Sequence, residues 1–72
     1  MFGKKLALRC IWMVAYLMTH RSLTFTDYAQ THGLSLRTYR RDLALLNEGG
    51  VITRTVRNHE EGKVVFVEAR FA

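Results

Sequence analysis

The sequence predicts an α+β fold in which three helices are followed by a β-hairpin. Apolar residues recur at helical spacing through the first two-thirds of the chain, whereas the last third is rich in Val, Ile, Thr and Phe. Glycines, rather than prolines, separate these segments. At 72 residues the chain can bury one modest core, so we expect a single domain spanning residues 1–72.

The first helix is predicted over residues 4–20, where apolar side chains occupy two roughly opposite faces. The inner face is formed by Leu6, Cys10, Met13, Val14 and Leu17. The outer stripe is formed by Leu8, Trp12 and Tyr16. Two interpretations of this stripe are open: the hairpin or a flanking residue such as Phe2 covers it, or it is the interface of a homodimer.

Two capped helices joined by a tight turn follow. Thr24, with Asp27 three residues later, is a variant of the capping box, and Gly33 ends this short helix. Ser35 caps the next helix, which is predicted over residues 36–48. Its buried seam is predicted to consist of Tyr39, Leu43 and Leu46, with Leu36 beside them. This pattern over residues 24–48 is that of a helix-turn-helix.

Residues 51–71 are predicted to form the hairpin, because two segments rich in Val, Ile and Thr flank the turn His59–Gly62. Three helices followed by a hairpin is the order of a winged helix domain, in which the hairpin is called the wing and the third helix is called the recognition helix. In that fold a short third strand often lies between the first two helices, and Ser22-Leu23 is the only candidate for it.

Three arginines, Arg37, Arg40 and Arg41, lie on the face of the predicted third helix opposite its buried seam, since each residue turns a helix by about 100°. Such a cluster usually marks only a solvated surface. Here the surrounding helix-turn-helix pattern favours DNA, because one α-helix fits the major groove and the arginine fork binds guanine or phosphate in bidentate fashion. Ser35 and Thr38, at the helix N-terminus, are expected beside a phosphate.

The hairpin supplies three further phosphate-contact candidates, Arg54, Arg57 and Lys63, on its strands and beside its turn. Phosphates would repel Glu60 and Glu61 at the tip. We therefore do not expect the tip to insert deeply into the minor groove.

The remaining charged residues near these segments have ordinary explanations. Two roles are open for Lys4, Lys5 and Arg9, contact with the DNA backbone and an ordinary solvated terminus, and we expect the second. Asp42 is expected to pair with Arg41 or another nearby basic group and thereby to orient the recognition helix.

The composition favours a polyanionic partner and excludes several classes of function. The net charge is +5 and the pI is about 10.0. Cys10 is the only cysteine and the three histidines lack metal-ligand spacing, so we expect no metal, cofactor or small-molecule ligand, and a reducing cytoplasm. No catalytic set is recognisable, so an enzyme is not expected. Arg9 interrupts the first apolar run, which is shorter than the ~20 residues of a spanning helix, so no membrane insertion is expected.

Three features of the sequence occur together in a known family. They are the capping Ser35, the run Arg40-Arg41-Asp42-Leu43, and Gly50-Val51-Ile52. On these, residues 24–52 resemble the N-terminal winged helix-turn-helix of DeoR-type bacterial regulators and the related domain that precedes WYL domains. The resemblance implies sequence-specific binding of double-stranded DNA by a homodimer and transcriptional repression at the nucleoid of a bacterium or in a phage. It places at the DNA Ser35, Arg37, Thr38, Arg40 and Arg41.

Those families carry a large C-terminal domain, whereas this chain stops at Ala72. Two interpretations are open, an excised domain and a small free-standing regulator of phage or mobile-element type. Two alternative functions are open as well. One is an excisionase or architectural DNA-binding protein of a mobile element. The other is a protein-interaction module, which the stripe of Leu8, Trp12 and Tyr16 would serve.

Overall fold

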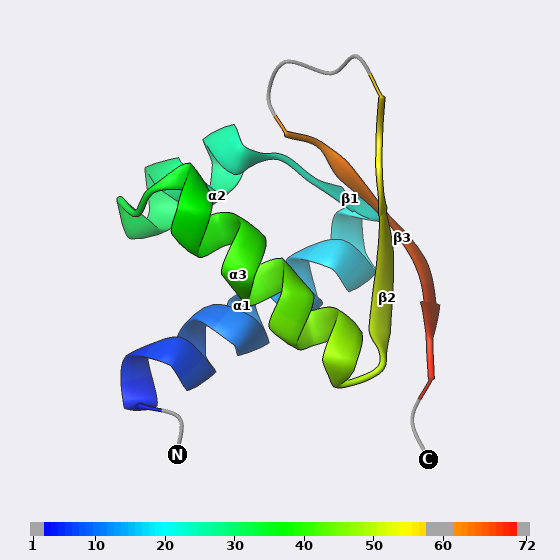
Figure 1. The fold of residues 1–72 in the computed structure, drawn as a ribbon, viewed down its shortest axis with the longest axis horizontal. Coiled ribbons are helices and arrows are strands. Elements are labelled where there is room, and N and C mark those ends of the chain that lie inside the picture. The colour runs from blue at the N-terminus through cyan, green and yellow to red at the C-terminus, as the bar shows by residue number, and fades with distance from the viewer. Residues whose placement is uncertain (1–2, 58–61, 71–72) are drawn as a thin grey trace.

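The computed structural model describes residues 3–57 and 62–70. In this part of the chain, three helices surround one face of a small antiparallel sheet (Figure 1). In the sheet β3 lies between β1 and β2. The elements are α1 (Lys4–His20), β1 (Ser22–Leu23), α2 (Phe25–His32), α3 (Leu36–Glu48), β2 (Val51–Thr55) and β3 (Val64–Ala69). The winged helix-turn-helix architecture is confirmed, with Ser22-Leu23 as its third strand.

The two helices of the helix-turn-helix begin at the caps that the sequence predicts. The Thr24 hydroxyl accepts a hydrogen bond from the backbone N–H of Asp27 at 3.1 Å. Between α2 and α3 the chain turns at Gly33, whose φ of 67° lies in the left-handed region that favours glycine. These local signals fix where α2 ends and where α3 starts.

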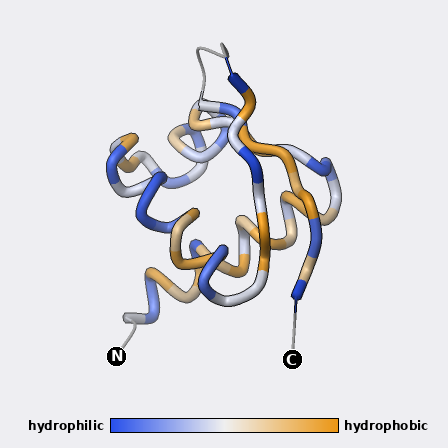
Figure 2. The backbone as a smooth tube through the Cα atoms, turned by 45° about the vertical axis from the view of Figure 1, so that its right-hand side comes forward, coloured by the Kyte–Doolittle hydropathy of each residue, from blue (hydrophilic) through white to orange (hydrophobic). Residues whose placement is uncertain are grey.

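The core lies where α1, α3 and the sheet meet. Figure 2 shows long hydrophobic stretches in α1 and the two long strands, whereas hydrophilic residues predominate in the first half of α3. The buried apolar side chains are Met13, Leu17, Leu23, Tyr28, Tyr39, Leu43, Leu46, Val51 and Val64. Leu36, expected beside the seam, is 37 % exposed instead, because the first turn of α3 lies at the rim of this core.

The outer stripe of α1 is covered in part, and by a different element from the one expected. The Trp12 ring meets the His32 ring edge-to-face at 4.7 Å between centroids, so the end of α2 packs on it rather than the hairpin. Tyr16 is likewise half-buried, 5.0 Å from Trp12. Leu8 remains 56 % exposed. Phe2, the other residue considered as a cover, lies outside the described residues.

Candidate nucleic-acid interface

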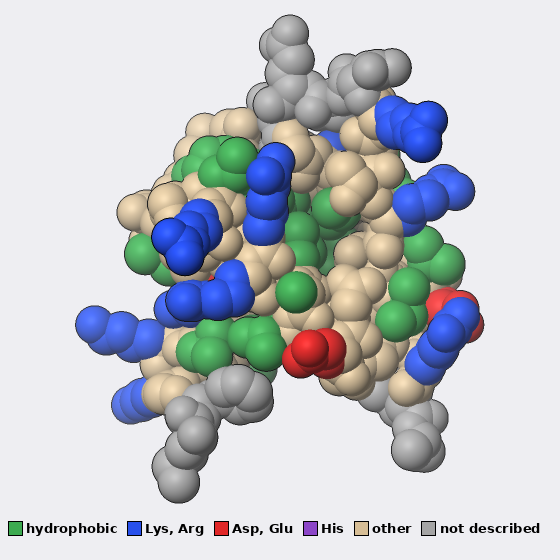
Figure 3. Space-filling model, in the orientation of Figure 1, with side chains coloured by type: hydrophobic (Ala, Val, Ile, Leu, Met, Phe, Trp, Pro, Cys, Tyr) green, Lys and Arg blue, Asp and Glu red, His purple; other side chains and the backbone are tan. Residues whose placement is uncertain are grey.

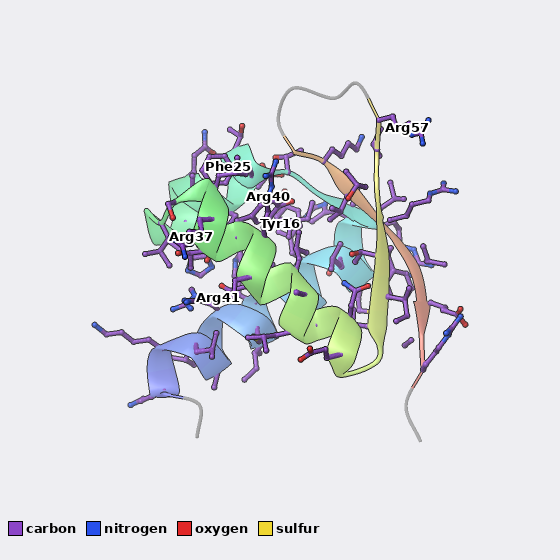
Figure 4. The ribbon with its side chains drawn as sticks, in the orientation of Figure 1. Tyr16, Phe25, Arg37, Arg40, Arg41 and Arg57 are labelled. Atoms are coloured by element: carbon purple, nitrogen blue, oxygen red, sulfur yellow. The ribbon has the colours of Figure 1, made fainter. Side chains whose placement is uncertain are left out.

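Helix α3 presents arginine on the face that points away from the core. Arg37, Arg40 and Arg41 are exposed and spread along the helix, as Figure 4 shows, while the seam on the opposite side is buried. None of the three guanidinium groups forms a hydrogen bond or ion pair with another described residue. Their charges and their five donors each are therefore available to a ligand.

The N-terminal end of α3 adds polar donors to this face. The Ser35 hydroxyl accepts a hydrogen bond from the backbone N–H of Thr38 at 3.3 Å, and the two hydroxyl oxygens lie 3.2 Å apart. The first turn contains no acidic residue, so nothing within it neutralises the positive end of the helix dipole. This end of α3 is suited to a phosphate group.

Tyr39 anchors the start of α3 to one end of the sheet, where β1 ends and β3 begins. Its hydroxyl lies 2.8 Å from the carbonyl oxygen of Gly62, at the base of the wing, and 3.3 Å from that of Leu23 in β1. Burial raises the pKa of the Tyr39 hydroxyl, which therefore remains a donor. Gly62 has a φ of 61°, and a side chain at this position would touch the Tyr39 ring. The wing and the recognition helix are thus joined at this point.

A fully buried carboxylate ties all three helices together. Asp42 in α3 accepts hydrogen bonds from Arg9 Nε of α1 at 2.8 Å and from the Tyr28 hydroxyl of α2 at 2.7 Å. Arg9 Nη2 also donates to the other carboxylate oxygen at 3.3 Å, so the contact between Arg9 and Asp42 is bidentate. Of the two kinds of partner expected for Asp42, the structure shows another basic group, Arg9, and not Arg41, because the carboxylate points into the helix junction and Arg41 points out of it.

The same contacts correct the interpretation of Arg9 as part of a solvated terminus. Its side chain is only 15 % exposed, and the hydrogen bond to Asp42 raises the pKa of its guanidinium. Burial and the hydrogen bond to Asp42 also raise the pKa of Tyr28 to about 12. A buried carboxylate with these two donors is satisfied, so it holds the helices in place.

The wing contributes further basic residues, in addition to the arginines of α3. Arg54 and Arg57 are exposed, Lys63 is partly buried, and Figure 4 places Arg57 at the far end of β2. Asn47, near the end of α3, donates to the Thr53 hydroxyl at 3.2 Å and accepts from its backbone N–H at 3.3 Å, which fixes the start of the wing. The tip with Glu60 and Glu61 lies outside the described residues.

The distribution of charge over the molecular surface is uneven. In Figure 3, Lys and Arg side chains gather over α3 and the first turns of α1, with a second group along the edge formed by the long strands. Acidic side chains visible on this face lie apart from the first group. In the described residues, no helix is long and apolar enough to cross a membrane, and no group of three or more His, Cys, Asp or Glu side chains could hold a metal ion.

A family model of the DeoR-like helix-turn-helix domain matches residues 9–58. The chain belongs to the DeoR-like helix-turn-helix family. The matched segment extends from Arg9 across α2 and α3 and past β2, which is more than two-thirds of the chain. No curated protein and no solved structure matches the chain significantly.

In this DeoR-like domain the predicted DNA-contact residues fall into two groups. Five come from α3 and its cap: Ser35, Arg37, Thr38, Arg40 and Arg41. Three come from the wing: Arg54, Arg57 and Lys63. In the first group, the three arginines lie on the exposed side of α3, and Ser35 and Thr38 lie at its N-terminal end. The second group lies on a separate element, as the sequence predicts for a recognition helix and its wing.

Sequence reasoning did not identify Arg9 as the partner of Asp42, nor the full burial of this carboxylate in the DeoR-like domain. The signal for Asp42 was present, since it lies three residues after Tyr39 and four before Leu46, within the buried seam. An acid in such a seam requires a partner. Arg9, the one charged residue inside the apolar run of α1, was the matching signal.

Proposed function

We propose that this DeoR-like domain is a sequence-specific transcriptional regulator of a bacterium or phage, which inserts α3 in the major groove of double-stranded DNA and represses transcription. The observation that carries the proposal is the unpaired arginine face of α3, opposite a seam anchored by Asp42 and Tyr39. A rigidly held helix with free guanidinium groups can read base edges, because bidentate contacts to guanine require accurate placement.

The three arginines of α3 and the remaining DNA-contact candidates differ in chemistry, so we expect them to contact different parts of the DNA. Arg37, Arg40 and Arg41 have the reach and the planar donors for base edges or flanking phosphates. Ser35 and Thr38 at the helix end, and the basic residues of the wing, hold the backbone and set the register of α3 in the groove. Repression needs no further surface, since a protein seated on promoter DNA blocks access to it.

Selection of bound duplexes from random DNA tests this function. We expect enrichment of one short motif, repeated with two-fold symmetry, and repression of a reporter whose promoter contains it. Binding should weaken with salt with a log–log slope of about −0.9 per phosphate neutralised. A pool without enrichment or a flat salt response would contradict DNA reading. A motif confined to recombination attachment sites would instead favour the architectural function.

We further propose that the domain acts as a homodimer through exposed apolar residues of α1. Two copies with a charge of +5 each repel one another, so their contact must lie on a surface without charge. Residues 10–18 of α1 contain no charged side chain. Ile11 is 65 % exposed and borders an apolar hollow that it shares with Cys10, Val14 and Ala15. A protruding residue beside a hollow is self-complementary under a two-fold axis.

The proposed interface is centred on Ile11, whereas the stripe predicted from the sequence consists of Leu8, Trp12 and Tyr16. Leu8 remains available on the surface, whereas Trp12 and Tyr16 already pack within the chain. Ile11→Glu should convert dimers to monomers in sedimentation analysis, because it places a charge at the contact. Val67→Glu, an equivalent change at a 49 % exposed valine of β3, should leave the dimer intact. A wild-type protein that sediments as a monomer at high concentration would refute the dimer.

A further inference from the structure

A surface pocket lies beside the helix-turn-helix, between the start of α1 and the turn that precedes α3. It has a volume of about 360 Å³ and is lined by Lys5, Leu8, Arg9, His32 and Leu34. Three of these five side chains are basic, and no acidic side chain lines the pocket. One water occupies about 30 Å³ in the liquid, so the pocket has room for a phosphate group and several waters.

His32 gives this pocket an unsatisfied hydrogen-bonding group. Its ring packs edge-to-face on Trp12, 4.7 Å between centroids, and is tilted against Tyr28 at 5.1 Å. Its Nε2 atom is buried and has no hydrogen-bond partner among the described residues. The ring borders the pocket, so an anionic oxygen bound there would satisfy a ring nitrogen if the ring turned about its Cβ–Cγ bond.

The charges around His32 also favour an anion. Arg9 and Lys5 approach from α1, Asp42 from α3, and Tyr28 belongs to the same helix. Burial and the positive charge of Arg9 lower the pKa of His32, and Asp42 offsets this only in part. Asp42 is already engaged by Arg9 and by the Tyr28 hydroxyl. A phosphate in the pocket would reverse the effect of Arg9 and favour the protonated ring.

The pocket lies beside the N-terminal end of α3, next to the helix that carries the arginines. Leu34 on its wall directly precedes the cap Ser35, and Arg9 on its floor holds Asp42, the neighbour of Arg41. The blue side chains in Figure 3 extend from α3 onto the first turns of α1, next to this position. A duplex seated on α3 would therefore present a phosphate to the pocket.

We propose that the pocket formed by Lys5, Arg9 and His32 binds one backbone phosphate of the DNA on which α3 is seated. Lys5 supplies the mobile charge, His32 donates a hydrogen bond, and Arg9 contributes charge while it remains paired with Asp42. The inference rests on the proposed DNA-binding function and adds a contact from α1 to the recognition helix and wing.

Matched lysine variants test the site, because Lys4 is a neighbouring exposed lysine that does not line the pocket. With a duplex selected by the wild-type protein, Lys5→Gln should weaken binding by about tenfold and reduce the steepness of the salt dependence by about 0.9. Lys4→Gln should change the affinity by less than about twofold. Both positions are exposed, so the fold should survive either change.

The histidine provides a second readout. Since the phosphate favours the protonated ring, binding takes up a proton, and wild-type affinity should rise as the pH falls towards the lowered pKa of His32 in the free protein and level off below it. His32→Gln should remove this rise. Equal effects of the two lysine variants, or an unchanged pH response in His32→Gln, would overturn the assignment. Wild-type binding of the selected duplex tests the proposed function itself, so failure of the pocket and failure of DNA binding are distinguishable.

Discussion

Replacement of Arg37, Arg40 and Arg41 by alanine together should abolish sequence-specific DNA binding while leaving the domain folded. The three side chains are exposed and make no hydrogen bond or ion pair with another described residue, so their removal leaves no group unpaired. Each arginine that reads a base contributes about 1–3 kcal/mol. If two of the three do so, the expected loss is about 2–6 kcal/mol, or roughly 30- to 20,000-fold in affinity.

Titration of the selected duplex and of an unrelated duplex measures this effect and separates its two sources. An arginine that reads a base should, when replaced alone, weaken only binding of the selected duplex. An arginine that holds a phosphate should weaken both by a similar factor and reduce the salt slope. Arg70→Ala, which removes an exposed arginine at the end of β3, serves as the control. Unchanged affinity in the triple variant would refute α3 as the recognition helix.

Asp42→Ala should destabilise the domain by about 3 kcal/mol or more. The carboxylate is fully buried, and its removal leaves the largely buried Arg9 charge and the Tyr28 hydroxyl without their partner. Loss of one member of a buried ion pair costs about 3–5 kcal/mol, and the 15 % exposure of Arg9 places the expectation at the lower end. At roughly 0.05–0.15 kcal/mol per residue, 72 residues have a total stability of about 4–11 kcal/mol.

Urea unfolding measures this loss, and the chain offers a matched control. Glu68 and Arg70 form an ion pair at 2.6 Å, slightly shorter than the 2.8 Å of Arg9 and Asp42, but both side chains are about half exposed or more. Glu68→Ala should therefore leave the free energy of unfolding almost unchanged, because water screens an exposed ion pair. The double variant Arg9→Met/Asp42→Leu should be more stable than Asp42→Ala, because no charge is left unpaired. If Asp42→Ala and Glu68→Ala had equal effects, the buried network would not hold the fold.

The two predictions separate the surface that binds from the contacts that position it. Arg41 and Asp42 are adjacent in sequence but point to opposite sides of α3. Replacement of Arg41 should therefore affect binding without affecting stability, whereas replacement of Asp42 should affect binding through the orientation of α3.

The sequence by itself determined the properties that depend on neighbours along the chain. Thr24 and Ser35 cap their helices because a hydroxyl there reaches an amide three residues later, wherever the helix lies. Gly33 ends α2 because its left-handed conformation is a local property. The spacing of Tyr39 and Leu43 likewise fixes which side of α3 is buried, and with it the outward direction of the arginines.

Only the tertiary structure decided which groups meet across the fold. Asp42 pairs with Arg9, 33 residues away, and Tyr39 donates to Gly62, 23 residues away. Trp12 is covered by His32 rather than by the hairpin. Helical spacing states where a side chain points on its own helix, but the group it meets depends on how the helices cross and how closely they pack. For that reason the arginine face was predictable, whereas the network behind it and the basic pocket beside it were not.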